Sequence, residues 1–139
     1  MPQLRSDRPI PLEALLELYA SVGWTAYTRE PETLERSFTG ATYVVGAWEA
    51  DELVGVCRIL SDDASILYVQ DILVDPDHQR RGIGRALLEN VLDRYSHCRQ
   101  KVLMTDDRPE QKAFYEALGF TRLDLREGPT LRAFVKLGD

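Results

Sequence analysis

The sequence predicts one mixed α/β domain over residues 1–139, with a mostly antiparallel sheet and helices on both of its faces. Length and composition support this, because 139 residues with 44% hydrophobic and 29% charged side chains can form one packed core. The apolar pattern changes between helical and strand periods in the order α, α, β, β, β, α, β, α, β, β. A run of hairpin-linked strands followed by one strand–helix–strand unit gives a mixed sheet.

Two helices are expected before the first strand. The first is predicted over Pro9–Gly23, where apolar residues recur at helical spacing and form one stripe. This stripe consists of Ile10, Leu12, Leu15, Leu16 and Tyr19. A shorter helix is predicted over Pro31–Phe38, and an aromatic-bearing connection, Gly23–Tyr27, joins the two.

Three strands follow these helices. Thr42–Glu49 and Leu53–Leu60 are rich in strand-forming residues, and the segment between them has the length of a hairpin turn. The third strand, Ala64–Val74, is nearly apolar apart from Gln70 and Asp71. Such a run is typical of a strand that is buried in the sheet.

The rest of the chain returns to helical patterns. A helix is predicted over Gly82–Tyr95, a short strand over Lys101–Thr105 and a helix over Pro109–Leu118. A final pair of strands is predicted from Thr121 onward, around the turn Gly128–Pro129.

Charge and cysteine usage exclude several classes of function. Seventeen basic and 23 acidic residues give a net charge of −6, so nucleic acid and anionic membranes are not expected as partners. The apolar runs are too short to span a bilayer, and no signal-peptide pattern precedes the first helix. The two cysteines, Cys57 and Cys98, are far apart and form no metal-binding motif. We therefore expect a cytoplasmic protein without a metal ion.

The segment Asp71–Leu88 carries the strongest chemical signal, because it joins a buried strand to a helix through a glycine turn. The first amides of a helix lack partners and carry a partial positive charge, so they bind phosphate well. Gly82 and Gly84 leave those amides uncovered, and three arginines add charge. These arginines are Arg80, Arg81 and Arg85.

An alternative explanation of this turn needs no ligand. Gly82 could serve only as a left-handed turn residue, and the arginines could form a solvated surface cluster. Two other phosphate motifs do not fit. The Gly-x-x-x-x-Gly-Lys-Ser/Thr loop is absent, and the Gly-x-Gly-x-x-Gly turn fails because its last position is Leu87.

The segment Gln79–Gly84 resembles the Gln/Arg-x-x-Gly-x-Gly/Ala signature of the GNAT superfamily of acyl-CoA-dependent N-acyltransferases. A second block, Ala113–Phe120, is similar to that family's Tyr-x-x-x-Gly-Phe helix end. The segments Leu18–Trp24 and Thr105–Asp107 are weakly similar to small bacterial and plastid relatives of aralkylamine acetyltransferases. The resemblance implies an acetyl-CoA-dependent N-acetyltransferase whose central parallel strand pair is splayed.

The resemblance also implies how acetyl-CoA is held. Its diphosphate would sit on the amides at the glycine turn, which Gln79 closes, and its pantetheine arm would pair with the third strand like an added strand. Arg108 stands where many relatives carry Asn, and it could still meet CoA. The residues assigned to the cofactor are Ile72, Leu73, Val74, Gln79, Arg80, Arg81, Gly82, Ile83, Gly84, Arg85 and Arg108.

For catalysis, the resemblance assigns Tyr115 as the general acid that protonates the CoA thiolate. An amide near Ile72 or Leu73 would stabilise the oxyanion. Asp71 is either the general base or a structural carboxylate, and the carboxylates of Asp106 and Asp107 are alternative bases. Direct transfer needs no acyl-enzyme, so both cysteines are interpreted as buried packing residues, and His78 and His97 as peripheral.

The acceptor is expected to be a small primary amine that enters beside the first two helices. Trp24 and Tyr27, with Tyr43, could form an aromatic wall for an arylalkyl amine, whereas Trp24 could instead plug the gap between the helices. The family resemblance also suggests a homodimer. The alternative function is a catalytically silent acyl-CoA-binding module, and a nucleotide-dependent enzyme is disfavoured by the missing loops.

Overall fold

A computed structural model of the chain describes residues 1–128 and 130–138. The chain divides into two compact units, Met1–Met104 and Thr105–Asp139. The first unit contains the sheet and four of the five α-helices of the described chain, and the second contains the fifth. Within the described residues, no helix is long and apolar enough to cross a membrane.

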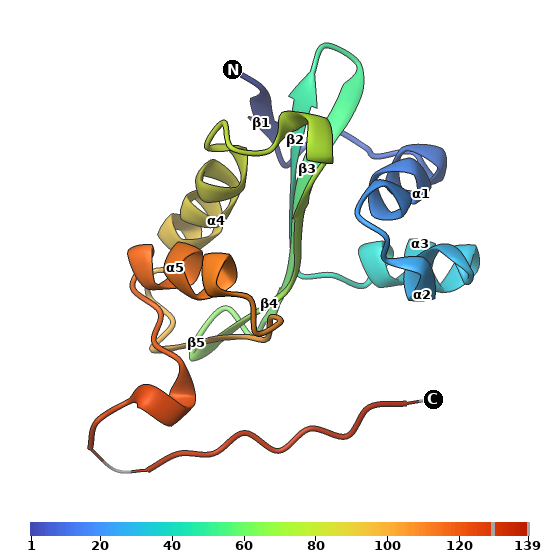
Figure 1. Cartoon of the computed structure of the whole chain (residues 1–139). Helices are drawn as coiled ribbons and strands as arrows, with labels where there is room; N and C mark the ends of the chain where they lie inside the picture. The colour runs from blue at the N-terminus through green and yellow to red at the C-terminus, as the bar shows by residue number, and fades with distance from the viewer. Residues whose placement is uncertain (129, 139) are drawn as a thin grey trace. The chain divides into compact units, whose positions relative to one another are not determined.

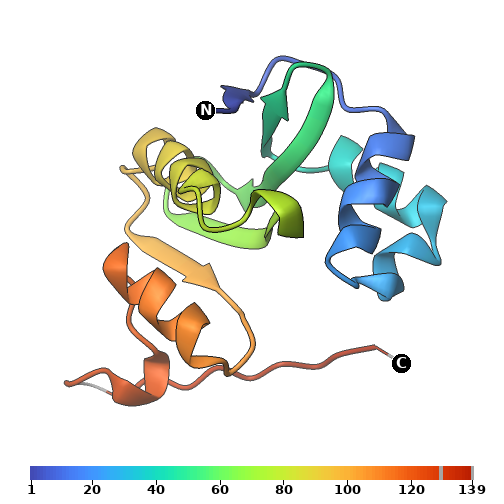
Figure 2. The same cartoon turned by 45° about the horizontal axis from the view of Figure 1, so that its top comes forward.

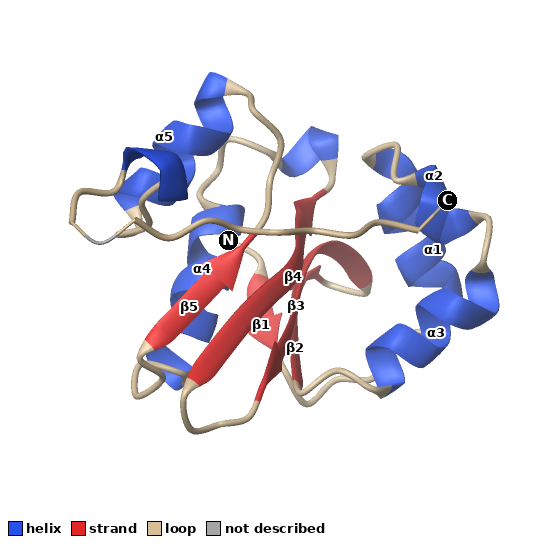
Figure 3. Cartoon of the chain, turned by 90° about the horizontal axis from the view of Figure 1, so that it is seen from below, coloured by secondary structure: helices blue, strands red, loops and turns tan. Residues whose placement is uncertain are grey.

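The first unit is built on a five-stranded sheet with the strand order β1-β2-β3-β4-β5 (Figure 3). Strands β1 to β4 pair in antiparallel fashion, and β5 runs parallel to β4. This confirms the mixed, mostly antiparallel sheet. The strands are β1 (Gln3–Arg5), β2 (Tyr43–Glu49), β3 (Glu52–Ser61), β4 (Ile66–Val74) and β5 (Gln100–Leu103).

Helices cover both faces of this sheet, as the sequence predicts (Figures 1 and 2). Helices α1 (Leu12–Ser21), α2 (Thr25–Thr28) and α3 (Pro31–Thr39) lie on one face, and α4 (Ile83–Arg94) lies on the other. Helix α4 packs closely, because a Cβ atom on Gly55 of β3 would stand 3.1 Å from a methyl group of Leu87. The core beneath α1 and α3 consists of Leu15, Leu18, Tyr19, Leu34, Trp48, Leu53, Val56 and Leu73.

Strand β5 pairs with only the first part of β4. Their pairing covers Ile66–Val69 of β4, and beyond it β4 has no strand neighbour on this side within the described residues. On the opposite side, Arg58 of β3 pairs with Asp71 while the next residue of β3 pairs with Val69, which leaves Gln70 as an extra residue. This is a β-bulge, which bends a strand and increases its twist. The parallel pair predicted here is confirmed, and β4 continues past the bulge without β5. The splay of the two strands stays a prediction.

The second unit contains α5 (Pro109–Ala117) and a short 3₁₀ turn, Leu123–Leu125. Here the prediction of two final strands is wrong, because residues 121–128 and 130–138 contain no strand; Pro129 lies outside the described residues. A strand persists only where a neighbour pairs with its main chain and its apolar face is covered. Most large apolar side chains of this segment are exposed instead. These are Leu125, Leu131, Phe134, Val135 and Leu137.

Candidate active site

The turn before α4 has an unusual backbone. Gly82, the residue that precedes the helix, has φ +82°, and Arg80 has φ +65°, so two of three successive residues are left-handed. Within the described chain, none of the amides of residues 80–85 donates a hydrogen bond, and the first helical bond runs from Ala86 N–H to Gly82 C=O. The Gln79 side-chain amide donates to the Val74 carbonyl at 3.0 Å. The turn is thereby tied to the end of β4 with its amides open.

The arginines of the turn are weakly engaged. Arg80 forms no ion pair within the described residues, and Arg81 Nη1 stands 3.9 Å from Glu49 Oε1. Arg85 Nε lies 2.7 Å from Glu89 Oε1 on the surface of α4. Exposed pairs of this kind contribute only about 0–1 kcal/mol, so these guanidinium groups can exchange their partners for a multiply charged anion at little cost.

The open edge of β4 lies directly before this turn. The Asp75 amide donates to the Val54 carbonyl of β3 at 2.9 Å. Because main-chain groups in a strand alternate between its two sides, those of Leu73 also face β3, whereas those of Ile72 and Val74 face the open edge. The bond from Gln79 to the Val74 carbonyl agrees with this assignment. Of the two amides predicted to stabilise an oxyanion, the geometry favours that of Ile72.

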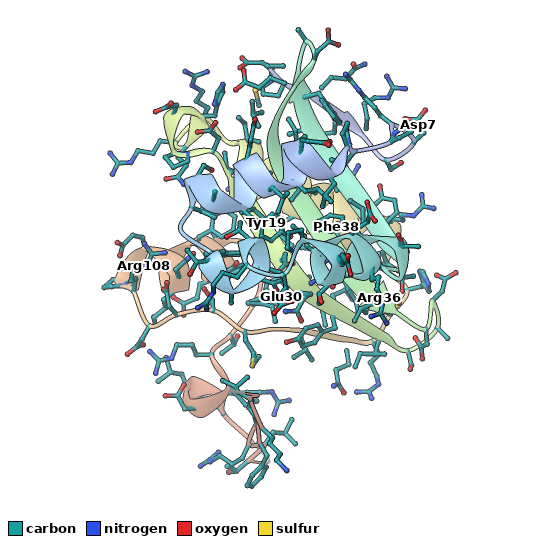
Figure 4. The ribbon with its side chains drawn as sticks, turned by 90° about the vertical axis from the view of Figure 1, so that its right-hand side faces the viewer. Asp7, Tyr19, Glu30, Arg36, Phe38 and Arg108 are labelled. Atoms are coloured by element: carbon teal, nitrogen blue, oxygen red, sulfur yellow. The ribbon has the colours of Figure 1, made fainter. Side chains whose placement is uncertain are left out.

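Asp71 lies at the bulge and is the centre of a buried polar network. Its side chain is 2% exposed, and its carboxylate accepts from Tyr19 Oη at 2.8 Å and Tyr27 Oη at 2.9 Å. Arg58 adds two contacts, through Nε at 2.9 Å and Nη2 at 2.8 Å. The Arg58 guanidinium also lies 5.5 Å from the ring centroid of Phe38, which packs edge-on against Tyr19 (Figure 4).

The electrostatics of this network keep every partner in its donor form. Burial, together with the Asp71 charge, raises the pKa of both Tyr19 and Tyr27 above the ordinary phenol value. Burial alone would lower the pKa of Arg58, but the charge and hydrogen bonds of Asp71 raise it overall. The Asp71 carboxylate already accepts from four donor groups, so a proton from a substrate would have to displace one of them. This geometry favours the structural role of Asp71 over the role of general base.

Trp24 and Tyr27 lie together, as expected for an aromatic wall, but both are engaged in packing. The Trp24 ring lies 5.7 Å from Tyr19 and 6.1 Å from Tyr27 and packs on the core, which favours its role as a plug. The hydroxyl of Tyr27 donates to Asp71, and the residue is half-buried. Tyr43 does not join them, because its hydroxyl donates to Asn90 Oδ1 on α4 at 2.7 Å.

The remaining candidates in the second unit are Tyr115 and the residues around Arg108. Tyr115 is a buried residue of α5, and its ring packs against Phe114 and Phe120 at 5.0 and 6.0 Å. Arg108 precedes α5, and its Nε donates to Asp106 Oδ2 at 2.9 Å. This hydrogen bond lowers the pKa of the Asp106 carboxyl. Asp106 is therefore poorly suited to accept a proton.

The cysteines are not placed for nucleophilic chemistry. Both are fully buried, and burial followed by the Asp71 charge raises the pKa of the Cys57 thiol to about 12. Among the residues that the structure describes, no group of three or more His, Cys, Asp or Glu side chains is arranged to hold a metal ion.

Two charged partners were missed in the sequence. Arg58 is the one cation in an otherwise apolar strand, and Asp71 is the one anion in the next such strand, so their mutual neutralisation could have been inferred. Glu49 was also missed: its carboxylate lies 2.6 Å from His78 Nε2, a contact that no sequence spacing indicates.

Comparison with known proteins identifies the family of this chain. A model of the acetyltransferase (GNAT) domain matches residues 17–128. A GNAT-family acetyltransferase of Streptococcus pneumoniae TIGR4 superposes with a TM-score of 0.82 at 29% identity, covering 98% of this chain and 99% of that one.

Two curated relatives match over shorter stretches. Mycothiol acetyltransferase of Clavibacter sepedonicus is 35% identical over 96 residues, which cover 69% of this chain and 30% of the relative. The [ribosomal protein bS18]-alanine N-acetyltransferase of Escherichia coli K12 is 35% identical over 74 residues, or 51% of this chain and 48% of the relative. The aligned part of the chain thus spans less than half the length of either relative.

The buried ion pair gives a prediction for stability. Asp71→Asn or Arg58→Met alone should lower the free energy of unfolding by about 3–5 kcal/mol, because each leaves a buried charge unpaired. The double variant Arg58→Met/Asp71→Asn should lose less than the sum of the two single losses, because either single variant already breaks the pair. Urea unfolding measures these changes, and Asp7→Asn in the exposed Arg5–Asp7 pair is the control. Wild-type stability in Asp71→Asn would contradict the network.

Proposed function

The chain belongs to the GNAT acetyltransferase family, and on this premise we propose that it transfers an acetyl group from acetyl-CoA directly to the nitrogen of a primary amine. One observation carries the proposal: among the described residues, an unpaired strand edge leads directly into a glycine turn whose amides have no partner. Acetyl-CoA has a matching pair of groups, an arm with peptide-like amides and a diphosphate. A cytoplasmic location and a homodimer stay predictions of the sequence.

The residues present fit the cofactor in two places. The space above Gly82 is open, since a Cβ atom there would meet nothing within 4 Å, and the amides of residues 80–85 and the side chain of Arg80 belong to the same turn. These groups would hold the diphosphate. The outward main-chain groups of Ile72 and Val74 would pair with the pantetheine arm as an added strand does. When bound, acetyl-CoA supplies the activated acyl group as a thioester.

The proposed chemistry is a direct displacement. The amine nitrogen forms a bond to the carbonyl carbon of the thioester, and the carbon–sulfur bond then breaks with its electron pair on sulfur. The Ile72 amide stabilises the negative charge on the carbonyl oxygen before the bond breaks. The ammonium first releases one proton to water, which leaves the nitrogen lone pair free to attack. Tyr115 donates its phenolic proton to the leaving thiolate, and the second proton of the nitrogen passes through water to restore the phenol. Asp71 takes the structural role and fixes the bulge before Ile72.

The acceptor is proposed only as a primary amine. One relative is named for an alanine of ribosomal protein bS18 and another for mycothiol, so acceptors differ among similar proteins. The net charge of −6 favours a cationic amine over a phosphorylated one. The engaged state of Asp71 supports the alternative, a silent acyl-CoA-binding module. Thiol release from acetyl-CoA over a panel of amines and N-terminal peptides separates the two, because a silent module binds CoA without turnover.

A matched glycine pair tests the diphosphate site. Gly82→Ala should raise the Kd of CoA at least about tenfold in calorimetry, because a methyl group takes up space proposed for the diphosphate. Gly23→Ala is the control, since Gly23 has nearly the same φ, +77°, and equally open surroundings. Both variants should lose similar stability from backbone strain. Equal Kd values for the two variants would remove the diphosphate from this turn.

The general acid is tested by removing one hydroxyl group. Tyr115→Phe should lower kcat by about 100-fold or more, in the range of general acid catalysis, while KM for acetyl-CoA changes less than about twofold. Steady-state kinetics across the pH range measures both. Tyr95→Phe, which alters another buried tyrosine, should leave kcat unchanged. If Tyr115→Phe keeps the wild-type kcat, another group protonates the thiolate.

A further inference from the structure

The side chain of Glu49 at the end of β2 faces two residues of the glycine turn. One carboxylate oxygen, Oε2, lies 2.6 Å from His78 Nε2, and the other, Oε1, lies 3.9 Å from Arg81 Nη1. His78 belongs to the short 3₁₀ helix Pro76–His78, which begins the turn. A strand far from the turn in sequence is thus tied to it by one side chain.

The two contacts of Glu49 differ in strength. The His78 side chain is 13% exposed and its contact is short, whereas the Arg81 side chain is 55% exposed and its contact is long. A short contact between partly buried groups outweighs a long one in water. Glu49 therefore acts on the turn mainly through His78.

Asp75 holds the main chain of His78 and lies near the other ring nitrogen. The His78 amide donates to the Asp75 carbonyl at 2.8 Å, and Asp75 Oδ2 lies 3.7 Å from His78 Nδ1. Asp75 Oδ1 also accepts from the Asp77 amide at 3.0 Å. The imidazole therefore lies between the carboxylates of Glu49 and Asp75, but among the described residues only Nε2 has a hydrogen-bond partner, which is Glu49.

The turn needs such an anchor because of its backbone. Arg80 is a non-glycine residue with φ +65°, and Gly82 follows with φ +82°. A left-handed non-glycine residue persists only where its surroundings fix the chain. In the described residues, the side-chain bonds that tie the start of this turn to the sheet come from Gln79 and His78.

We propose that His78, held by Glu49, is a positioning residue for the cofactor: it fixes the turn in the conformation that presents the amides of residues 80–85. It sets the affinity for CoA without contact with CoA. This inference rests on the proposed function, and it gives His78 a role in place of the peripheral position expected from the sequence. On cofactor binding, Arg81 exchanges Glu49 for the diphosphate while His78 keeps its contact.

Variants of the pair give the main test. His78→Ala and Glu49→Leu should each raise the Kd of CoA about tenfold in calorimetry. The double variant should have a Kd no higher than the higher of the two single-variant values, because both substitutions remove the same contact. Glu49→Gln keeps an oxygen that can accept from Nε2–H, so its Kd should stay within about threefold of wild type. His97→Ala, which removes an exposed histidine paired with Asp63, is the control.

A second substrate separates positioning from general damage to the fold. S-acetylpantetheine carries the thioester and the amide arm but lacks the diphosphate. In His78→Ala, kcat/KM should fall about tenfold with acetyl-CoA and stay unchanged with S-acetylpantetheine, and kcat at saturating acetyl-CoA should also stay unchanged. Equal losses with both substrates would assign His78 a purely structural role and overturn the inference.

The outcomes also distinguish this inference from the proposed function. If wild-type protein neither binds CoA nor prefers acetyl-CoA to S-acetylpantetheine, the proposed diphosphate site fails and the inference fails with it. If wild type shows both properties and His78→Ala and Glu49→Leu match wild type in Kd, only the inference is overturned.

Discussion

The fold of the first unit depends on the buried contact between Arg58 and Asp71. This ion pair joins β3 to β4 at the bulge, and two phenol groups connect the same carboxylate to α1 and α2. An ionised carboxylate can stay buried only if its partners satisfy it, so the pair fixes where these four elements meet. The bulge lies at this point, and pairing with β5 ends one residue before it.

The edge of β4 is open because β5 ends before the bulge, and the glycine turn comes directly after this edge in the chain. Beyond the bulge, the outward main-chain groups of β4 have no strand neighbour in the described chain, and the turn then leads into α4 with free amides. Both features offer backbone groups to a ligand. The side chains named in the proposal therefore act mainly by holding the backbone in place. Gln79 ties the turn to Val74, and His78 ties it to Glu49.

Local patterns in the sequence predicted the longer helices and strands, because amphipathic stripes and apolar runs report burial directly. The splay of β4 and β5 was expected only from the resemblance to the GNAT family. Contacts between distant segments could not be read in this way: Glu49 and His78 are 29 residues apart, and Tyr27 and Asp71 are 44 apart. The strand β1 escaped notice because it has three residues, and the strands expected after Thr121 failed because an apolar pattern supplies no pairing neighbour.

In the proposed complex, a ligand with an amide arm and a diphosphate uses the edge of β4 and the turn before α4 together. A crystal structure of the protein with bound CoA tests it most directly. We expect the pantetheine amides to be hydrogen-bonded to main-chain groups of Ile72 and Val74, with the diphosphate against the amides that begin α4. Well-defined CoA bound elsewhere on the protein, with the β4 edge and the turn unchanged, would contradict it.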